Sequence, residues 1–117
     1  MGVHSMTINK ITPKELHERL QGEEKLVLLD VRDKEKYNQF HIEESCNVPK
    51  SVIFGLEESG EITLQSLPKG QEMIVTCTTG NSATKCAQIL DAHNYQVTIL
   101  DGGITAWKAY ISSLRNE

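Results

Sequence analysis

A cysteine at the junction of an expected strand and an expected helix is the residue of this chain best suited to nucleophilic chemistry. Cys77 ends the apolar run 73–77, and the pattern becomes helical after the loop 78–82. A thiol there lies under the first turn of a helix, where unpaired backbone N–H groups and the positive end of the helix dipole stabilise a thiolate or a bound oxyanion. The sequence therefore predicts a nucleophile that needs no metal ion.

A buried structural cysteine is the simpler alternative, because free cysteines often pack as small apolar residues. The composition of the loop favours the chemical interpretation. Gly80 allows a tightly curled backbone, Asn81 tolerates left-handed geometry, and Ser82 is a good helix N-cap. The loop is predicted to curl around a bound group.

The elements that must position this loop alternate between helices and strands. Thr12 and Glu15 form a capping box at the start of a helix that should end near Gly22. Strands are expected at 25–31, 45–48, 72–77 and 96–100, and helices at 33–40, 82–93 and after the turn 102–103, with a short helix or two in 50–70. This order predicts an α/β domain with a mostly parallel sheet. Ligands bind at the carboxyl ends of such strands, where Asp30, Cys77 and Asp101 fall.

The composition excludes several classes of function. The chain has 117 residues and a net charge of −4, and its Lys and Arg residues are scattered, so a nucleic-acid footprint is missing. Three cysteines without zinc-type spacing argue against a disulfide framework and a structural metal. No apolar stretch reaches the ~18 residues of a membrane span and no signal-peptide pattern opens the chain, so we expect a cytoplasmic protein. Residues 1–6 are expected to be a loose tail or expression remnant before a single domain at 7–115.

With these elements in order, the chain resembles the rhodanese (sulfurtransferase) domain over residues 8–114. Four stretches carry the likeness, and the loop 77–82 has the family's six-residue length. The stretches are 28–32 with Tyr37, 40–42, 47–49, and 100–104 with Trp107. The resemblance implies a three-layer fold whose central, mostly parallel, five-stranded sheet is flanked by helices.

The resemblance also implies a reaction. Cys77 would take sulfane sulfur from thiosulfate or a low-molecular-weight persulfide, hold it as a persulfide, and pass it to a thiol, cyanide or protein acceptor. No cofactor, metal, nucleic acid or membrane is needed, and the oligomeric state stays open between monomer and weak dimer. The N–H donors around the sulfur and the departing group would come from Thr78, Thr79, Gly80, Asn81, Ser82 and Ala83.

Two departures from the family bear on the substrate. Many members place Arg or Lys inside the loop to bind the sulfonate of thiosulfate, whereas residues 78–82 carry no charge. Lys85 is the nearest cation in sequence, and it is either a substrate contact or a solvated helix residue. The uncharged loop predicts weak use of thiosulfate and a preference for persulfides. Phe40 also stands where the family usually has Gly, which changes packing and access.

The other candidate residues are expected to be structural. Asp30 and Arg32 resemble the supporting polar pair beneath the loop, since buried charges are normally paired. His41 is expected to be a hydrogen-bonded anchor, because a thiolate at a helix N-terminus requires no base. Cys86 falls on the apolar face of its helix and Cys46 at an apolar family position, so both are expected to be buried.

Two other functions compete with sulfur transfer. A phosphatase would need a longer loop ending in Arg, the bidentate donor to phosphate, and position 82 is Ser. A non-catalytic or regulatory interaction module, whether or not excised from a larger fusion protein, commonly loses the loop cysteine. That cysteine is present here, which favours catalysis.

Overall fold

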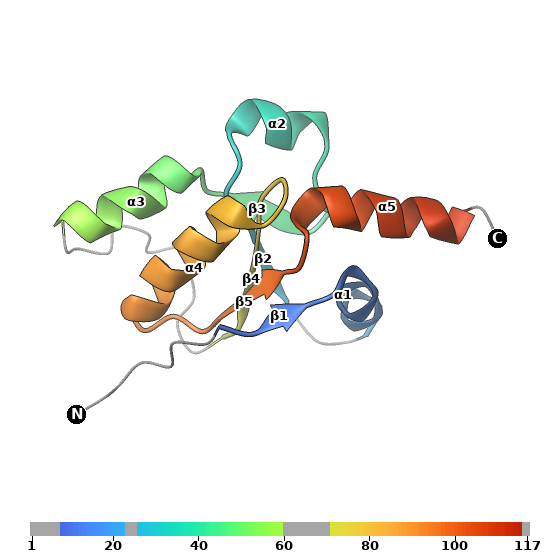
Figure 1. Ribbon diagram of the computed structural model, residues 1–117, viewed down its shortest axis with the longest axis horizontal. Coiled ribbons are helices and arrows are strands. Elements are labelled where there is room, and N and C mark those ends of the chain that lie inside the picture. The colour runs from blue at the N-terminus through green and yellow to red at the C-terminus, as the bar shows by residue number, and fades with distance from the viewer. Residues whose placement is uncertain (1–7, 23–25, 60–70, 116–117) are drawn as a thin grey trace.

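The computed structural model describes residues 8–22, 26–59 and 71–115, so the expected tail lies outside the described residues. Its strands form one sheet in the order β1-β5-β4-β2-β3, and every pairing is parallel (Figure 1). The strands are β1 (Lys10–Ile11), β2 (Val27–Asp30), β3 (Ser45–Asn47), β4 (Met73–Thr76) and β5 (Val97–Leu100). The helices are α1 (Pro13–Leu20), α2 (Lys34–Gln39), α3 (Lys50–Ser59), α4 (Asn81–Ala92) and α5 (Gly103–Arg115).

Both faces of the sheet are covered by helices. Leu28 pairs with Ile74 and Leu29 with Val75, and successive residues of a strand point to opposite faces. Leu28 and Ile74 belong to the hydrophobic cluster that α1 and α5 complete, whereas Leu29 and Val75 belong to the cluster under α3 and α4. The predicted three-layer α/β fold with a five-stranded sheet is confirmed, and within the described residues the sheet is wholly parallel.

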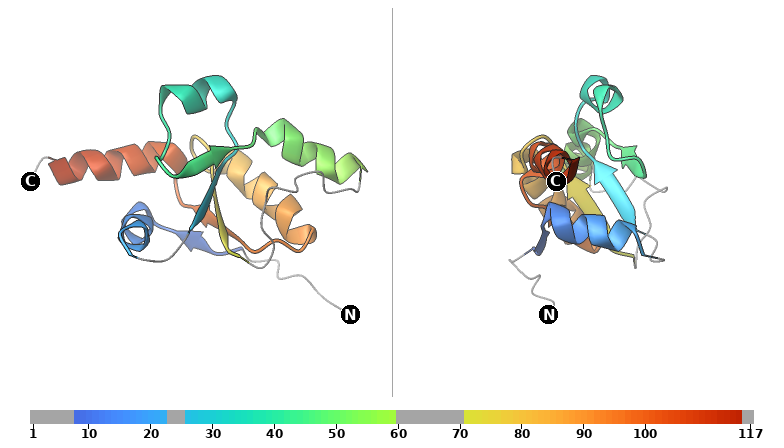
Figure 2. Two further views of the ribbon diagram at one scale, coloured as in Figure 1. Left: turned by 180° about the vertical axis from the view of Figure 1, so that it is seen from behind. Right: turned by 90° about the vertical axis from the view of Figure 1, so that its right-hand side faces the viewer.

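The central strand explains why this architecture forms. All four residues of β4 are buried, because β4 lies between β2 and β5 and has a helical layer on each face. Near-continuous apolar sequence is what such a strand requires. The short helix α2 stands apart from both layers (Figure 2). Helix α2 can therefore form one wall of a site at the carboxyl end of the strands.

The first helix begins as predicted. The Thr12 side chain accepts a hydrogen bond from the Glu15 backbone N–H at 3.1 Å, and the Thr12 N–H donates to Glu15 Oε1 at 2.9 Å. Gln21 is the C-cap, so Gly22 follows the cap. Within the described ranges, no helix is long and apolar enough to cross a bilayer.

Candidate active site

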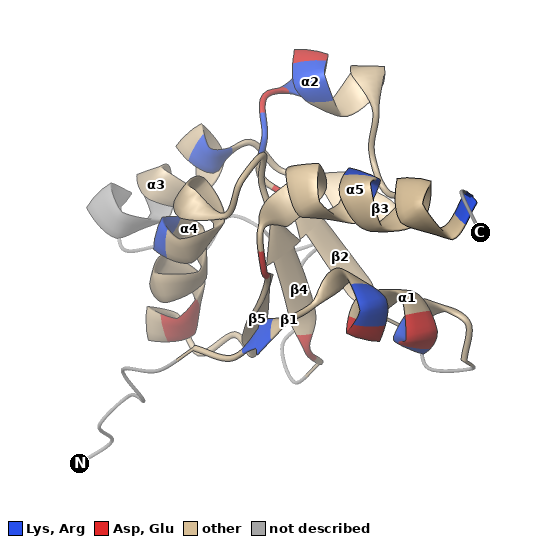
Figure 3. Ribbon diagram, turned by 45° about the vertical axis from the view of Figure 1, so that its right-hand side comes forward, with Lys and Arg blue, Asp and Glu red and all other residues tan. Residues whose placement is uncertain are grey.

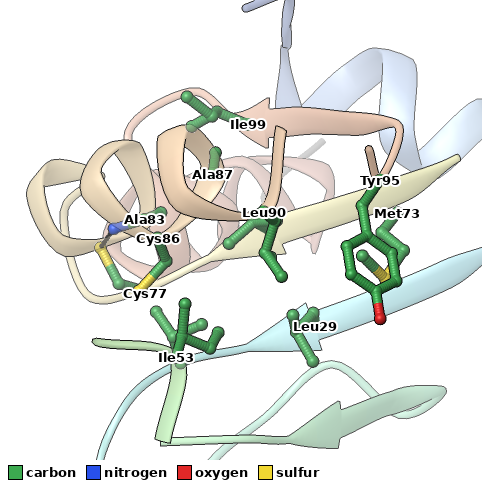
Figure 4. Close-up of a cluster of buried hydrophobic side chains, with 12 residues drawn as sticks. Leu29, Ile53, Met73, Cys77, Ala83, Cys86, Ala87, Leu90, Tyr95 and Ile99 are labelled. Carbon is green, nitrogen blue, oxygen red and sulfur yellow. Dashed lines mark hydrogen bonds between the residues drawn. The ribbon is translucent and has the colours of Figure 1, made fainter. Parts of the chain in front are cut away.

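Cys77 directly follows the central strand β4 and lies beneath the first turn of α4. Its Sγ accepts hydrogen bonds from the backbone N–H groups of Gly80 at 3.0 Å and Ala83 at 3.3 Å. Figure 4 shows the second of these contacts at the edge of the core cluster. Cys77 is only 4% exposed, so these two N–H groups take the place of water as hydrogen-bond donors to its sulfur. Converging N–H groups stabilise negative charge on the sulfur.

The loop curls at Gly80. Its φ of 111° lies in the left-handed region, which glycine enters without steric cost. Gly80 is also the N-cap of α4, and its carbonyl accepts from the backbone N–H and the hydroxyl of Thr84 at 3.0 and 2.8 Å. The expectation that Ser82 caps the helix is wrong, because the helix has already begun at Asn81. The left-handed residue is likewise Gly80 and not Asn81.

The start of α5 holds the backbone of the loop. The Ile104 N–H donates to the Cys77 carbonyl at 2.8 Å, and the Thr105 N–H donates to the Thr78 carbonyl at 3.0 Å. Gly103 makes this approach possible, since a Cβ at that position would lie 2.4 Å from the Cys77 oxygen and 2.7 Å from the Thr78 oxygen. The Gly-Gly pair thus supplies a docking point for the loop as well as the expected turn.

Asp30 and Arg32 form a buried ion pair at the end of β2. Arg32 Nε donates to Asp30 Oδ1 at 2.9 Å, and its terminal nitrogen donates to Oδ2 at 2.7 Å. The same nitrogen donates to the Phe40 carbonyl at 2.6 Å, so the pair ties the end of β2 to the end of α2. His41 contacts Tyr37. Its Nδ1 is 2.8 Å from the Tyr37 carbonyl oxygen, and the two rings stack with their centres 3.9 Å apart.

A cavity of about 230 Å³ opens beside Cys77. Four loop residues line it, and two lysines from other elements face them. Lys36 comes from α2 and Lys50 from the first position of α3, whose N–H donates to the Val31 carbonyl at 2.9 Å. The described lining is Val31, Arg32, Asp33, Lys36, Lys50, Cys77, Thr78, Thr79, Asn81 and Ser82.

The architecture and this loop lead to one family. The family model of the rhodanese-like domain matches residues 12–110. The chain belongs to the rhodanese-like domain family. This rhodanese-like domain is 39% identical over 98 residues to the probable adenylyltransferase/sulfurtransferase MoeZ of Mycobacterium tuberculosis, a match covering 83% of this chain and 24% of that protein.

Two further likenesses span nearly whole proteins. The putative sulfurtransferase YtwF of Bacillus subtilis is 26% identical over 103 residues, which is 88% of this chain and 93% of YtwF. A crystal structure of a rhodanese-like domain protein from Staphylococcus aureus superposes with a TM-score of 0.75 at 24% identity, covering 86% of this chain and 91% of that one. The rhodanese-like domain spans about a quarter of the length of MoeZ and nearly all of YtwF.

The cations at the thiol of this rhodanese-like domain are not the one that the sequence singled out. Lys85 is exposed on α4 and is absent from the described lining of the cavity, whereas Lys36 and Lys50 are part of it. Lys36 follows β2 and Lys50 follows β3, and the carboxyl ends of both strands lie at the same end of the sheet as Cys77. That shared end was the available signal, because ligands bind there in open parallel sheets.

The remaining cysteines of the domain differ from one another. Cys86 is fully buried on the core face of α4, as predicted. Figure 4 shows its side chain in the core cluster near that of Cys77. Burial raises the pKa of the Cys86 thiol to about 12, with the neighbouring Cys77 as the second cause, so Cys86 stays protonated near neutral pH. Cys46 is exposed, contrary to prediction, because it lies on β3, which is an edge strand of the sheet that the described residues form.

Proposed function

We propose that this rhodanese-like domain is a sulfurtransferase that carries sulfane sulfur as a persulfide on Cys77. The observation behind the proposal is the pair of backbone donors, Gly80 and Ala83, that point at Cys77 Sγ from the start of α4. The sulfurtransferase names of MoeZ and YtwF support the same reaction class. Within the described residues, no group of three His, Cys, Asp or Glu could hold a metal ion.

In the first half-reaction, the Cys77 thiolate attacks the outer sulfur of thiosulfate or of a low-molecular-weight persulfide. A bond forms between Cys77 Sγ and that sulfur, and the S–S bond of the donor breaks. Its electron pair leaves with sulfite or with the donor thiolate. The N–H groups of residues 78–83 hold the negative charge on the thiolate and on the departing group, as oxyanion-hole donors do.

In the second half-reaction, an acceptor takes the outer sulfur away. A thiolate of a small molecule or a protein attacks that sulfur, a new S–S bond forms on the acceptor, and Cys77 leaves as a thiolate. The two steps together are neutral in electrons, so the cycle requires no redox cofactor. Asp30, Arg32 and His41 take no part in bond making in this scheme. The buried pair Asp30–Arg32 supports the walls of the cavity.

Mass spectrometry tests the central intermediate. The domain is incubated with thiosulfate or glutathione persulfide, the excess donor is removed, and the cysteine peptides are mapped. We expect the mass of one added sulfur on the peptide that contains Cys77, and the same gain in the Cys86→Ser variant. No gain is expected in Cys77→Ser. Sulfur found only on Cys46 or Cys86, or on no cysteine, would contradict the proposal.

A second role is an interaction module within a larger protein. The chain is 35% identical over 89 residues to a TBC domain-containing protein kinase-like protein of Gallus gallus, and the match covers 10% of that protein. That relative is named as a kinase-like protein. A folded domain that stays free of persulfide in the experiment above would favour this role over catalysis.

A further inference from the structure

A second cavity adjoins the cavity at Cys77. It has a volume of about 200 Å³ and shares Arg32, Lys36 and Thr78 with its neighbour. Phe40 and Lys108 of α5 are among the residues that line the second cavity and not the first. A ligand whose sulfur lies at Cys77 can therefore extend past Lys36 toward Lys108.

The second cavity is more uniformly basic than the first. Asp33 lines the cavity at Cys77 together with Lys36 and Lys50, whereas no Asp or Glu is among the described residues that line the second. Arg32 is engaged by Asp30, but neither Lys36 nor Lys108 forms an ion pair with any described residue. The positive charges of these two ammonium groups are therefore available to attract an anionic ligand, although the chain as a whole carries a net charge of −4.

Phe40 gives this cavity a defined wall. Lys108 Nζ lies 4.8 Å from the centre of the Phe40 ring, within the range of a cation–π contact. The ring thus holds the ammonium group near the cavity and supplies an apolar surface beside it.

We propose that the second cavity is a subsite for the far carboxylate of a peptide-sized thiol, whose sulfur end lies against Cys77. The proposal deepens the proposed function and rests on it. Each cavity is smaller than the roughly 300 Å³ at which pockets for drug-sized ligands begin, whereas the two together exceed it. Thiosulfate fills only the first cavity, and a thiol with a carboxylate several bonds from its sulfur reaches the second.

The same subsite serves both directions of the transfer. The persulfide of such a thiol gives its outer sulfur to Cys77 and leaves as a thiolate. The free thiolate of the same molecule attacks the outer sulfur of the Cys77 persulfide in the reverse step. One binding site therefore recognises the molecule as donor and as acceptor, without any further oxidant or reductant.

Donor selectivity tests the subsite. We would measure kcat/KM for glutathione persulfide and for thiosulfate, with cyanide as the common acceptor, in the wild type, Lys108→Gln and Lys34→Gln. The loss of one charge-assisted contact should lower the ratio of the two kcat/KM values about fivefold in Lys108→Gln, chiefly through the KM of glutathione persulfide. Lys34→Gln is the matched control, because Lys34 is exposed and lines neither cavity in the described structure.

A donor without carboxylates completes the design. N-acetylcysteamine persulfide is uncharged at its far end, so Lys108→Gln should not lower its kcat/KM relative to thiosulfate. An unchanged ratio for glutathione persulfide in Lys108→Gln, with thiosulfate transfer intact, would overturn the subsite alone. An equal loss for both persulfides would also overturn it, since the far carboxylate would then be irrelevant. Failure of every donor in the wild type would overturn the proposed function, and the subsite with it.

Discussion

Charged residues at the two ends of the sheet differ in their ion pairing. At the amino end of β4, Arg19 and Glu72 form an ion pair at 2.8 Å, and the Thr98 hydroxyl donates to the same carboxylate. At the carboxyl end, Arg32 is paired with Asp30, whereas Lys36, Lys50 and Lys108 have no carboxylate partner among the described residues. Figure 3 shows charged residues on helices near both ends.

This contrast separates charges that serve the fold from charges available to a ligand. The cavity at the amino end, with a volume of about 550 Å³, is larger than the one at Cys77, yet Arg19 and Glu72 in its wall are engaged with each other. The hydrogen bond from Arg19 is the main cause that lowers the pKa of the Glu72 carboxyl. Cavity size alone would favour the amino end, whereas the proposed reaction uses the smaller cavity at Cys77.

The largest expected effect is on turnover at the carboxyl end. Cys77→Ser should lower sulfur transfer about a thousandfold or more, because a hydroxyl in this loop is a far weaker nucleophile than a thiolate. Glu72→Gln, at the other end, should keep kcat/KM within about twofold of the wild type. Steady-state assays with thiosulfate and cyanide measure both. An equal loss of kcat/KM in the two variants would show that the two ends do not differ in function.

The two ion pairs should differ in stability as they do in burial. Asp30→Asn leaves the Arg32 cation, whose side chain is 7% exposed, without its partner, and should reduce the free energy of unfolding by about 3 kcal/mol or more. Glu72→Gln breaks a pair whose side chains are 28% and 34% exposed, so solvent screening limits the loss to about 1 kcal/mol or less. Urea denaturation of both variants measures these values. A Glu72→Gln loss as large as that of Asp30→Asn would contradict the comparison.

A methyl group at the contact between α5 and the loop should disturb the thiol without touching it. Gly103→Ala places a Cβ against two backbone oxygens and requires a φ of 63°, so we expect a loss of about 2 kcal/mol in stability. We also expect kcat/KM to fall about tenfold or more, because small displacements of a reacting group are costly.

Gly55→Ala is the matched glycine control. A Cβ at Gly55 in α3 meets no atom within 4 Å apart from its chain neighbours and the backbone of its own helix, so this variant should gain up to about 1 kcal/mol with unchanged activity. Thermal unfolding and initial rates are compared for both variants. If Gly103→Ala kept full activity, the docking of α5 would not matter to the thiol.

The smallest expected effect is the pH dependence of the amino-end pair. The pKa of Glu72 is lowered from 4.5 in the folded state, so the unfolded chain binds the proton more tightly. The contribution of the pair is therefore present above about pH 4.5 and is lost as the pH falls below that value. Wild type and Glu72→Gln should differ by less than about 1 kcal/mol at pH 6 and converge toward pH 3. A difference that grew with acid would reverse the sign of this argument.

Features contained in consecutive residues could be predicted from the sequence. The capping box at Thr12 and Glu15 needs only its own turn of helix, and the position of Cys77 between a strand and a helix needs only the local pattern. Lys36, Lys50 and Lys108 could not be placed in this way. They come together through the pairing of β2 with β3 and β4 and the docking of α5 on the loop.

Positions with two adequate local solutions were also beyond the sequence. Gly80 and Ser82 both suit a helix N-cap. The helix begins after Gly80, whose backbone is left-handed, so Gly80 is the N-cap. Cys46 is apolar in type, and only the place of β3 at the edge of the sheet makes it exposed. For Cys46, the outcome depends on strands far away in the chain.

The hydrogen bonds to Cys77 Sγ come from the main chain, and this has an evolutionary consequence. Every residue except proline carries the N–H group that does this work. Side chains at 78, 79, 81 and 82 can therefore drift by mutation while the sulfur keeps its donors. Under the proposed function, substitutions at these four positions are expected to change which sulfur donor is preferred while the hydrogen bonds to the sulfur remain.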